Sequence, residues 1–300
     1  MSTRLYNKGV HLRVAAIDFL NPAPLMWDFI HPPRASLMAE RYSIHLTLPS
    51  QCAIQILAGE ADLGLIPIAA LTPELRIVPG CTIASLSHVR SIQLISKLPL
   101  AEIQTVAADT ASRSSVAYAE VIFRHFLRTQ PSFSPALADP VAMLEHHDAA
   151  LLIGDPALIA LEQRSTIEAK TGALEWHDVA NLWHTYTGLP WVAAVWAVRA
   201  DASLSPRERQ QLFLDLNTSR RRGQHHIEAL VEEWTPRIAL SPGTIRTYLT
   251  KNIHYLLDAP CREAIHRFRT LAVEHNILPP LDPLPFLDLT ERYGGGEAGQ

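Results

Sequence analysis

The chain has 300 residues, of which 48% are hydrophobic and 19% charged, a composition typical of a globular protein with a substantial core. Its 26 basic and 30 acidic residues give a net charge of −4, which argues against a broad basic surface for nucleic acid and against a polybasic contact with a membrane. It has no apolar run of the roughly 18 to 20 residues that span a bilayer, and its opening segment lacks the apolar core of a secretory signal, so we expect a cytoplasmic protein.

Short apolar runs alternate with helical patterns through the first hundred residues. Strands are predicted over 13–20, 62–70 and 91–96, where turn residues bound the apolar runs. Two prolines, Pro22 and Pro24, break the first strand before a helix that opens over 25–29. Ser50 is the predicted N-cap of a helix that ends at Gly59.

The same alternation continues to about residue 200. Strands are predicted over 105–108, 149–153 and 191–198, and the clearest amphipathic helix over 114–128. A further helix opens at Gly154-Asp155-Pro156, with Asp155 as N-cap and Pro156 as the first helical residue. After Ser205 the pattern is helical to about 277, and residues 293–300 are predicted to be disordered.

Strands that alternate with helices predict an α/β fold with mainly parallel sheets. We see no internal repeat and no long linker between two halves. If the chain forms two domains, it must cross between them on ordered strands, and residues 91–97 and 191–198 are the candidates.

Several common catalytic signatures are absent from the sequence. It contains no GxGxxG, GxxxxGK[ST], GxSxG or HExxH motif, so simple nucleotide-binding, serine-hydrolase and zinc-protease interpretations lose their usual support. The three cysteines are too widely spaced for a disulfide framework or a CxxC pair, and we predict buried thiols. Adjacent histidines such as His146-His147 point about 100° apart on a helix, so we expect no metal site. The basic run 220–222 is predicted to be a solvated helix face.

The most informative segment is 109–115, which follows a strand and precedes the best helix. It carries Thr110, Ser112, Arg113, Ser114 and Ser115. A helix start favours anions, hydroxyls add donors, and an arginine grips a carboxylate with two parallel bonds. A plain N-cap needs only one of these residues, so an anion site and a simple cap remain two alternatives.

Asn21 follows the first predicted strand directly, in a loop bracketed by prolines. Ligands of α/β sheets bind beyond the carboxyl ends of strands, which favours a binding role. An Asx-type turn before the next helix is the alternative.

A series of ordered segments resembles the chorismate dehydratases of the futalosine route to menaquinone. The segments are AIDFLN (16–21), LAGEADLGLIP (57–67), VRS (89–91), TASRSSV (110–116), AALLIGDPAL (149–158) and TGLPWV (187–192). The resemblance spans about residues 13–200, and a weaker similarity in the helical pattern continues to about 277. It departs at one place, since members often carry Asp-Gly-Pro where Ser87-His88 precedes Val89 here.

The resemblance implies a two-lobed clamp like the type 2 periplasmic binding proteins, with two mixed sheets flanked by helices. The first lobe would comprise 1–97 and 195–300, the second 98–194, and the ligand cleft would lie between them. No cofactor and no metal are implied. The substrate would be chorismate, and the oligomeric state is left open.

Site residues follow from the same resemblance. It implies a catalytic role for Asn21 and Ser91. It implies substrate-binding roles for Thr110, Ser112, Arg113, Ser114, Ser115, Gly154 and Asp155.

The implied reaction is loss of water from chorismate to give 3-[(1-carboxyvinyl)oxy]benzoate. These residues include no obvious His or Glu base, which leaves the substrate's own enolpyruvyl carboxylate as a candidate. Two alternatives are a non-catalytic cytosolic protein that binds small carboxylates and the related 1,4-dihydroxy-6-naphthoate synthase.

Overall fold

The computed structural model describes residues 10–111 and 113–290. The predicted site residue Ser112 and the predicted disordered segment 293–300 therefore lie outside the described residues. Within the described part, no helix combines the length and apolar character needed to cross a membrane.

One sheet has six strands in the order β11-β4-β10-β3-β1-β2. The strands are β1 (Leu12–Ile17), β2 (Tyr42–Thr47), β3 (Leu63–Pro67), β4 (Leu75–Ser85), β10 (Trp191–Arg199) and β11 (His254–Leu257). Strand β1 pairs in parallel with β2 and β3, whereas β10 runs antiparallel between β3 and β4. The late strand β10 therefore joins two early parts of the chain.

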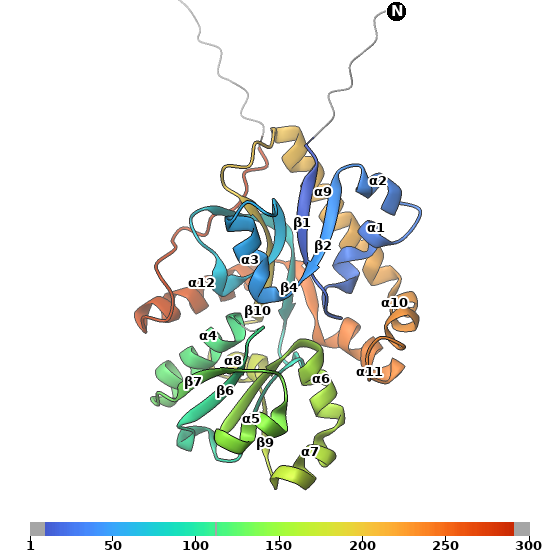
Figure 1. Cartoon of the computed structure of the whole chain (residues 1–300). Helices are drawn as coiled ribbons and strands as arrows, with labels where there is room; N and C mark the ends of the chain where they lie inside the picture. The colour runs from blue at the N-terminus through green and yellow to red at the C-terminus, as the bar shows by residue number, and fades with distance from the viewer. Residues whose placement is uncertain (1–9, 112, 291–300) are drawn as a thin grey trace, which may run out of the picture.

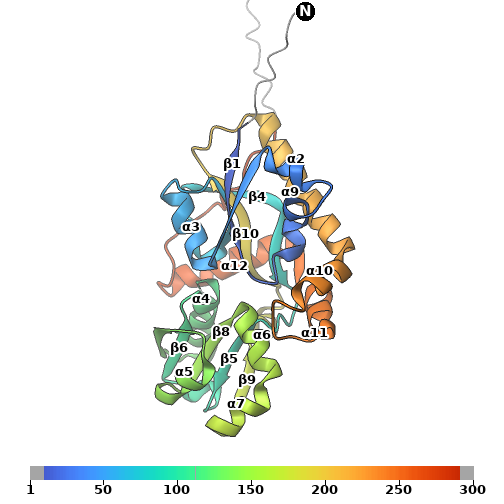
Figure 2. The same ribbon diagram turned by 45° about the vertical axis from the view of Figure 1, so that its right-hand side comes forward.

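The other sheet has five strands in the order β7-β6-β8-β5-β9. The strands are β5 (Ile92–Ser96), β6 (Thr105–Asp109), β7 (Ser132–Ala136), β8 (Ala149–Ile153) and β9 (Glu175–Asp178). Strand β6 is parallel to β7 and β8, and β5 is antiparallel to β8 and β9. Figures 1 and 2 show the two sheets in separate halves of the molecule.

The observed sheets confirm the α/β class and the two mixed sheets flanked by helices. The expectation of mainly parallel sheets is wrong, because β5, β10 and β11 run antiparallel to their neighbours. The expected boundary at 97 also differs from the sheet membership, since β5 belongs to the five-stranded sheet. The chain crosses between the halves over residues 86–91 and returns over 188–190.

Helices cover both sheets. They are η1 (Ala23–Met26), α1 (Trp27–Ile30), α2 (Ala35–Ala39), α3 (Pro49–Leu57), η2 (Ile68–Ala70), η3 (Leu100–Glu102), α4 (Ser114–Val121) with its π-helical continuation η4 (Ile122–Leu127), α5 (Pro140–His146), α6 (Gly154–Glu162), α7 (Arg164–Thr171), α8 (Val179–Thr187), α9 (Pro206–His225), α10 (Ile227–Trp234), α11 (Pro242–Thr247), the π-helical η5 (Tyr248–Asn252) and α12 (Ala259–Glu274). The long helical stretch predicted after Ser205 is interrupted by β11, where pairing with β4 overrides the helical pattern.

Two predicted caps are wrong. The N-cap of α3 is Leu48, so Ser50 lies inside the first turn. The N-cap of α6 is Ile153, and Asp155 lies in the first turn, where its carboxylate accepts a hydrogen bond from outside the helix. In both cases the helix starts earlier than the side-chain pattern indicates.

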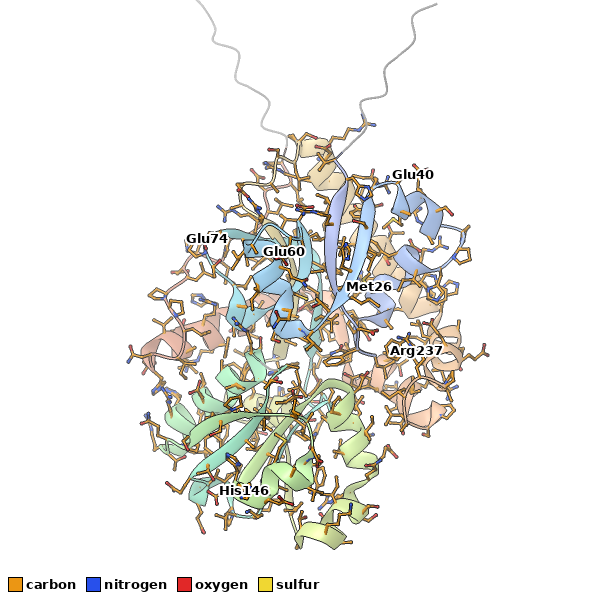
Figure 3. The ribbon with its side chains drawn as sticks, viewed as in Figure 1. Met26, Glu40, Glu60, Glu74, His146 and Arg237 are labelled. Atoms are coloured by element: carbon orange, nitrogen blue, oxygen red, sulfur yellow. The ribbon has the colours of Figure 1, made fainter. Side chains whose placement is uncertain are left out.

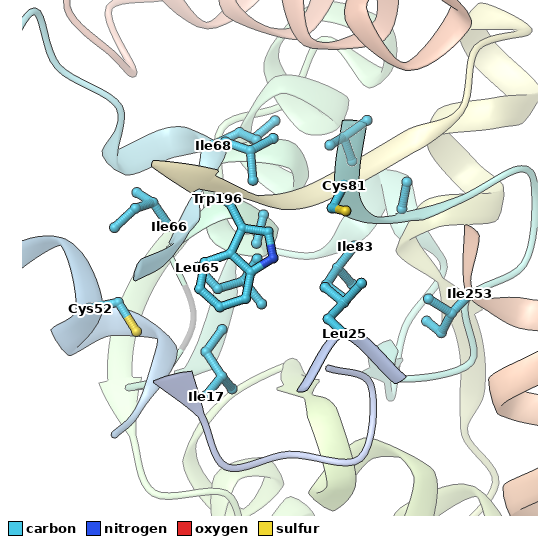
Figure 4. Close-up of a cluster of buried hydrophobic side chains, with 14 of the residues drawn as sticks. Ile17, Leu25, Cys52, Leu65, Ile66, Ile68, Cys81, Ile83, Trp196 and Ile253 are labelled. Carbon is cyan, nitrogen blue, oxygen red and sulfur yellow. The ribbon is translucent and has the colours of Figure 1, made fainter. Parts of the chain in front are cut away.

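A continuous apolar core runs through both halves of the molecule. Figure 4 shows Ile17, Leu65 and Ile83 around the Trp196 indole, with the thiols of Cys52 and Cys81 in the same buried cluster. All three cysteines are free and buried, as predicted. Burial raises the pKa of Cys52 and of Cys81 to about 12, so both thiols stay protonated and pack as apolar groups.

Helix α9 packs on the N-terminal segment through a buried ionic cluster. The Nε atom of Arg222 lies 2.9 Å from the carboxylate of Asp28, which is almost fully buried, and Arg34 approaches the same group at 3.0 Å. The prediction of a solvated face for 220–222 is therefore wrong for Arg222. A Cβ at Gly223 would lie 2.0 Å from the Pro24 carbonyl oxygen, so a glycine is required where α9 meets η1.

Candidate active site

A cavity lies where strand ends from both sheets meet. Its wall includes Ile17 and Pro67, the last residues of β1 and β3, and Ile153, the last residue of β8. Ile92 at the start of β5 and Trp191 at the start of β10 complete this ring of strand ends. The position agrees with the rule that α/β sheets bind ligands beyond the carboxyl ends of their strands.

The cavity collects most of the predicted site residues. Its lining includes Asn21, Ser91, Arg113, Ser114, Ser115 and Gly154. Two predicted residues do not belong to it: Thr110 is exposed, with its backbone N–H donating to Ala136, and Asp155 lies behind the wall.

Ser91 is held by a residue that the sequence does not single out. The Oη atom of Tyr248 donates a hydrogen bond of 2.8 Å to Ser91 Oγ, and both residues are at most 2% exposed. Burial raises the pKa of Tyr248, and hydrogen bonds with Ser91 and Asn21 act in the opposite direction. Tyr248 lies on η5, within a helical stretch where a core position is all that the periodicity indicates.

Two buried polar atoms of the cavity lining have no hydrogen-bond partner among the described residues. They are Oδ1 of Asn21, an acceptor, and Nε1 of Trp191, a donor. Buried polar groups are hydrogen-bonded in the large majority of cases, so each unpaired atom needs an explanation. A ligand that offers both a donor and an acceptor supplies one. Sequence reasoning treated Trp191 only as a strand residue and missed its indole N–H.

The start of α4 faces the same cavity. Its N-cap residue is Arg113, whose side chain makes no capping hydrogen bond, so the alternative of a simple cap by that residue fails. Ser114 Oγ donates to the Ala193 carbonyl oxygen at 2.9 Å and accepts the Ala69 N–H at 3.3 Å, which ties this helix to the six-stranded half. Ser115 and Arg113 line the cavity beside it.

Asp155 positions the loop that carries Asn21. Its Oδ1 accepts the backbone N–H of Leu20 at 3.1 Å. Burial raises the pKa of Asp155 to about 6; the nearby Asp18 adds to this, while the Leu20 hydrogen bond and Arg237 oppose it. This carboxylate therefore links α6 of one half to the strand end of the other.

Gly154 is constrained by the same junction. Its φ is +62°, its N–H donates to the Ser91 carbonyl oxygen at 2.8 Å, and a Cβ would lie 2.7 Å from the Phe19 ring. Only glycine meets both demands without strain. The Gly154-Asp155 pair thus supports both Ser91 and the Asn21 loop.

The crossing segment is anchored despite its departure from the family pattern at Ser87-His88. The His88 carbonyl oxygen accepts from Asn252 Nδ2 at 3.1 Å. The Arg90 N–H donates to Asp178 at 2.6 Å, and Arg90 has a positive φ of 64°. Residues from both halves therefore fix the backbone directly before Ser91.

Two side-chain groups elsewhere have metal-ligand chemistry. One comprises His125, Glu274 and His275, and the other His254, Asp258 and Cys261; within each, the ligand atoms lie within 4.8 Å of one another. Neither group contributes to the cavity lining. The His146 side chain lies in the half that carries the five-stranded sheet, well away from the six-stranded one (Figure 3).

Comparisons with known proteins agree with this architecture. A family model described as menaquinone biosynthesis matches residues 12–274. The chain is 27% identical over 250 residues to the chorismate dehydratase of Thermus thermophilus, covering 80% of this chain and 90% of that one.

Solved structures show the fold. A protein of Archaeoglobus fulgidus superposes with a TM-score of 0.68 at 13% identity, over 89% of this chain and 98% of its own. The periplasmic aliphatic sulphonate binding protein of Escherichia coli gives 0.66 at 15% identity, over 95% and 94%. The expected periplasmic-binding-protein-like fold is confirmed.

Proposed function

The chain belongs to the menaquinone biosynthesis family, and from that premise we propose that it is a chorismate dehydratase, a hydro-lyase that converts chorismate to 3-[(1-carboxyvinyl)oxy]benzoate and water. The observation that carries the proposal is the single cavity that gathers Asn21, Ser91 and the start of α4. The named relative from Thermus thermophilus supports the choice of substrate.

The reaction makes modest demands on the protein. Chorismate is a cyclohexadiene with two carboxylates, a ring hydroxyl and an enolpyruvyl ether. Loss of the C3 proton and the C4 hydroxyl makes the ring aromatic, so the overall change is strongly downhill. The protein must hold the ring, bind the carboxylates and stabilise charge that develops on the ring carboxylate.

The cavity wall matches those demands. The start of α4 offers backbone N–H groups, with Arg113 and Ser115 beside them, for one carboxylate. Asn21 and Ser91 would hydrogen-bond the ring hydroxyl. Apolar side chains such as Phe19 and Ile83 would contact the ring faces.

The cavity lining contains, among the described residues, no His, Asp, Glu, Lys, Cys or Tyr side chain. We therefore assign the proton transfer to the substrate's enolpyruvyl carboxylate. It takes the C3 proton as the C4–O bond breaks with its electron pair, and it passes that proton to the departing hydroxide. Water forms, and the protonation state of the protein does not change.

Two further assignments belong to this proposal. The halves that carry the two sheets would act as lobes that close on the substrate. The protein would work in the cytoplasm, where its three single thiols stay reduced.

The test is direct. The purified full chain is incubated with chorismate, the loss of substrate is followed in the ultraviolet, and the product is identified by mass spectrometry. We expect the aromatic ether, and a kcat lower by roughly 100- to 1,000-fold in Asn21→Ala and in Ser91→Ala, the cost of losing one preorganised polar contact. Ser134→Ala, on strand β7 and outside the cavity lining, is the matched control and keeps wild-type turnover.

Two outcomes would overturn the proposal, and a third would correct the role given to Asn21. Chorismate that binds and is recovered unchanged indicates a binding protein. Turnover of a cyclic futalosine in place of chorismate indicates the naphthoate synthase. Wild-type turnover in Asn21→Ala removes that amide from the mechanism.

A further inference from the structure

We propose that Tyr248, which lies behind the cavity wall, is a positioning residue that fixes the direction of one hydrogen-bonding group. It turns the O–H of Ser91 toward the ligand. As it applies to catalysis, this inference rests on the function proposed above.

The direction at Ser91 follows from a count of protons. Tyr248 Oη has one proton and donates it to Ser91 Oγ across 2.8 Å. The serine oxygen is then the acceptor, so its own proton must point elsewhere. Ser91 lines the cavity, and no hydrogen bond donated by its hydroxyl is found within 10–111 and 113–290. The free O–H is therefore available to a ligand.

A tyrosine suits this task because its proton stays in place. Tyr248 is almost completely buried, and Asp155 and Asp178 lie near enough for their charges to raise its pKa further. The phenol therefore remains a neutral donor at neutral pH and well above it. Its hydrogen bond to Ser91 joins η5 to the end of the crossing segment before β5.

The oriented serine recognises a hydrogen-bond acceptor. Ser91 presents a donor to the cavity, which matches the oxygen of an alcohol. In the proposed reaction that alcohol is the ring hydroxyl at C4, whose oxygen Ser91 would stabilise as the C4–O bond breaks.

The test compares two tyrosines. Tyr248→Phe removes only the phenol oxygen that contacts Ser91. The matched control is Tyr255→Phe, because Tyr255 is equally buried, lies close to Tyr248, and its Oη has no partner among the described residues. We expect kcat to fall roughly 10- to 100-fold in Tyr248→Phe, since loss of alignment by about 1 Å costs up to about 100-fold. KM stays within about threefold and the melting temperature within a few degrees, whereas Tyr255→Phe keeps the wild-type kcat.

A double variant separates positioning from a general structural role. If Tyr248 acts through Ser91, adding Tyr248→Phe to Ser91→Ala lowers kcat no further. Multiplicative losses in the double variant, an unchanged kcat in Tyr248→Phe, or an equal loss in Tyr255→Phe would each overturn the inference.

An activity-independent measurement keeps the two proposals distinguishable. A buried phenol proton that donates to Ser91 exchanges slowly and gives its own downfield proton resonance. We expect this resonance to vanish in Tyr248→Phe, to shift in Ser91→Ala and to stay in Ser134→Ala. If the wild-type chain leaves chorismate intact and the resonance still shifts in Ser91→Ala, the dehydratase proposal fails and the positioning role stands. A resonance that does not shift in Ser91→Ala overturns the positioning role.

Discussion

Replacing Asp155 by asparagine is expected to stabilise the protein at neutral pH. The Asp155 carboxylate is buried and its pKa rises from 3.8 to about 6, chiefly because burial disfavours the charged form. Its structural task is to accept the Leu20 N–H at 3.1 Å. The oxygen of an asparagine side chain performs the same task without a charge, so Asp155→Asn removes the burial penalty and keeps the hydrogen bond.

The size and sign of the effect follow from proton linkage. A folded-state pKa above the unfolded value means that the ionised group opposes folding, fully above about pH 6 and not at all well below pH 4. A rise of about two pH units corresponds to roughly 3 kcal/mol at ~1.36 kcal/mol each. We expect Asp155→Asn to gain about 2–3 kcal/mol at pH 8, about 1.5 kcal/mol at pH 5 and about 0.5 kcal/mol at pH 4.

Urea unfolding of the wild type and the variant at these three pH values measures the gain. Asp155→Ala is the control, because it removes the charge and also leaves the buried Leu20 N–H unpaired, which costs about 1–3 kcal/mol relative to Asn. The reasoning is refuted if Asp155→Asn is no more stable than the wild type at pH 8, or if its gain is the same at pH 4 and pH 8.

Four further substitutions probe the cavity. Arg113→Ala should raise KM for chorismate by roughly 10- to 100-fold with a smaller change in kcat, as loss of a charge-assisted bond of about 1.5–3 kcal/mol predicts; an unchanged KM in steady-state kinetics argues against carboxylate binding there. Gly154→Ala should lower the free energy of unfolding by about 1–3 kcal/mol, because its Cβ meets the Phe19 ring at a positive φ; thermal melting checks this. Ser115→Ala should weaken substrate binding. Ser114→Ala should instead lower the free energy of unfolding by about 1–3 kcal/mol, because the hydroxyl of Ser114 hydrogen-bonds two backbone groups. Urea titration and KM measured on both variants distinguish the two effects.

The fold was predictable where local pattern and burial agree. The apolar runs at β1, β8 and β10 gave strands, and the amphipathic stretch from 114 gave α4 with its continuation η4. The direction of β10 and the strand β11 were missed, because antiparallel pairing with β4 is a long-range contact that leaves no local pattern. The predicted N-cap at Asp155 was wrong for a related reason. Its carboxylate accepts a long-range hydrogen bond from the Leu20 N–H and does not cap its own helix.

The site residues, too, were predictable from the sequence only where a local pattern marks them. Arg113 and its neighbouring hydroxyls were visible because a strand, a polar turn and a helix are adjacent in sequence. Ser91 has no local signal and was found only through the family resemblance. The sequence did not identify Tyr248 and Trp191 as site residues. A buried aromatic residue in an apolar stretch is predicted to be a core residue, and only the structure shows its polar atom beside a cavity.

The place of β10 between β3 and β4 has a consequence for how the protein is made. Residues 92–178 contain the whole five-stranded sheet, so this half is ready to assemble as soon as it leaves the ribosome. The six-stranded sheet must wait, because β4 reaches β3 only through a strand translated about a hundred residues later. Until β10 is made, the edges of β3 and β4 that it will cover stay unpaired, and both strands are strongly apolar. Unpaired apolar strand edges promote aggregation. A nascent chain halted before residue 191 is therefore the form in which this protein most needs a chaperone.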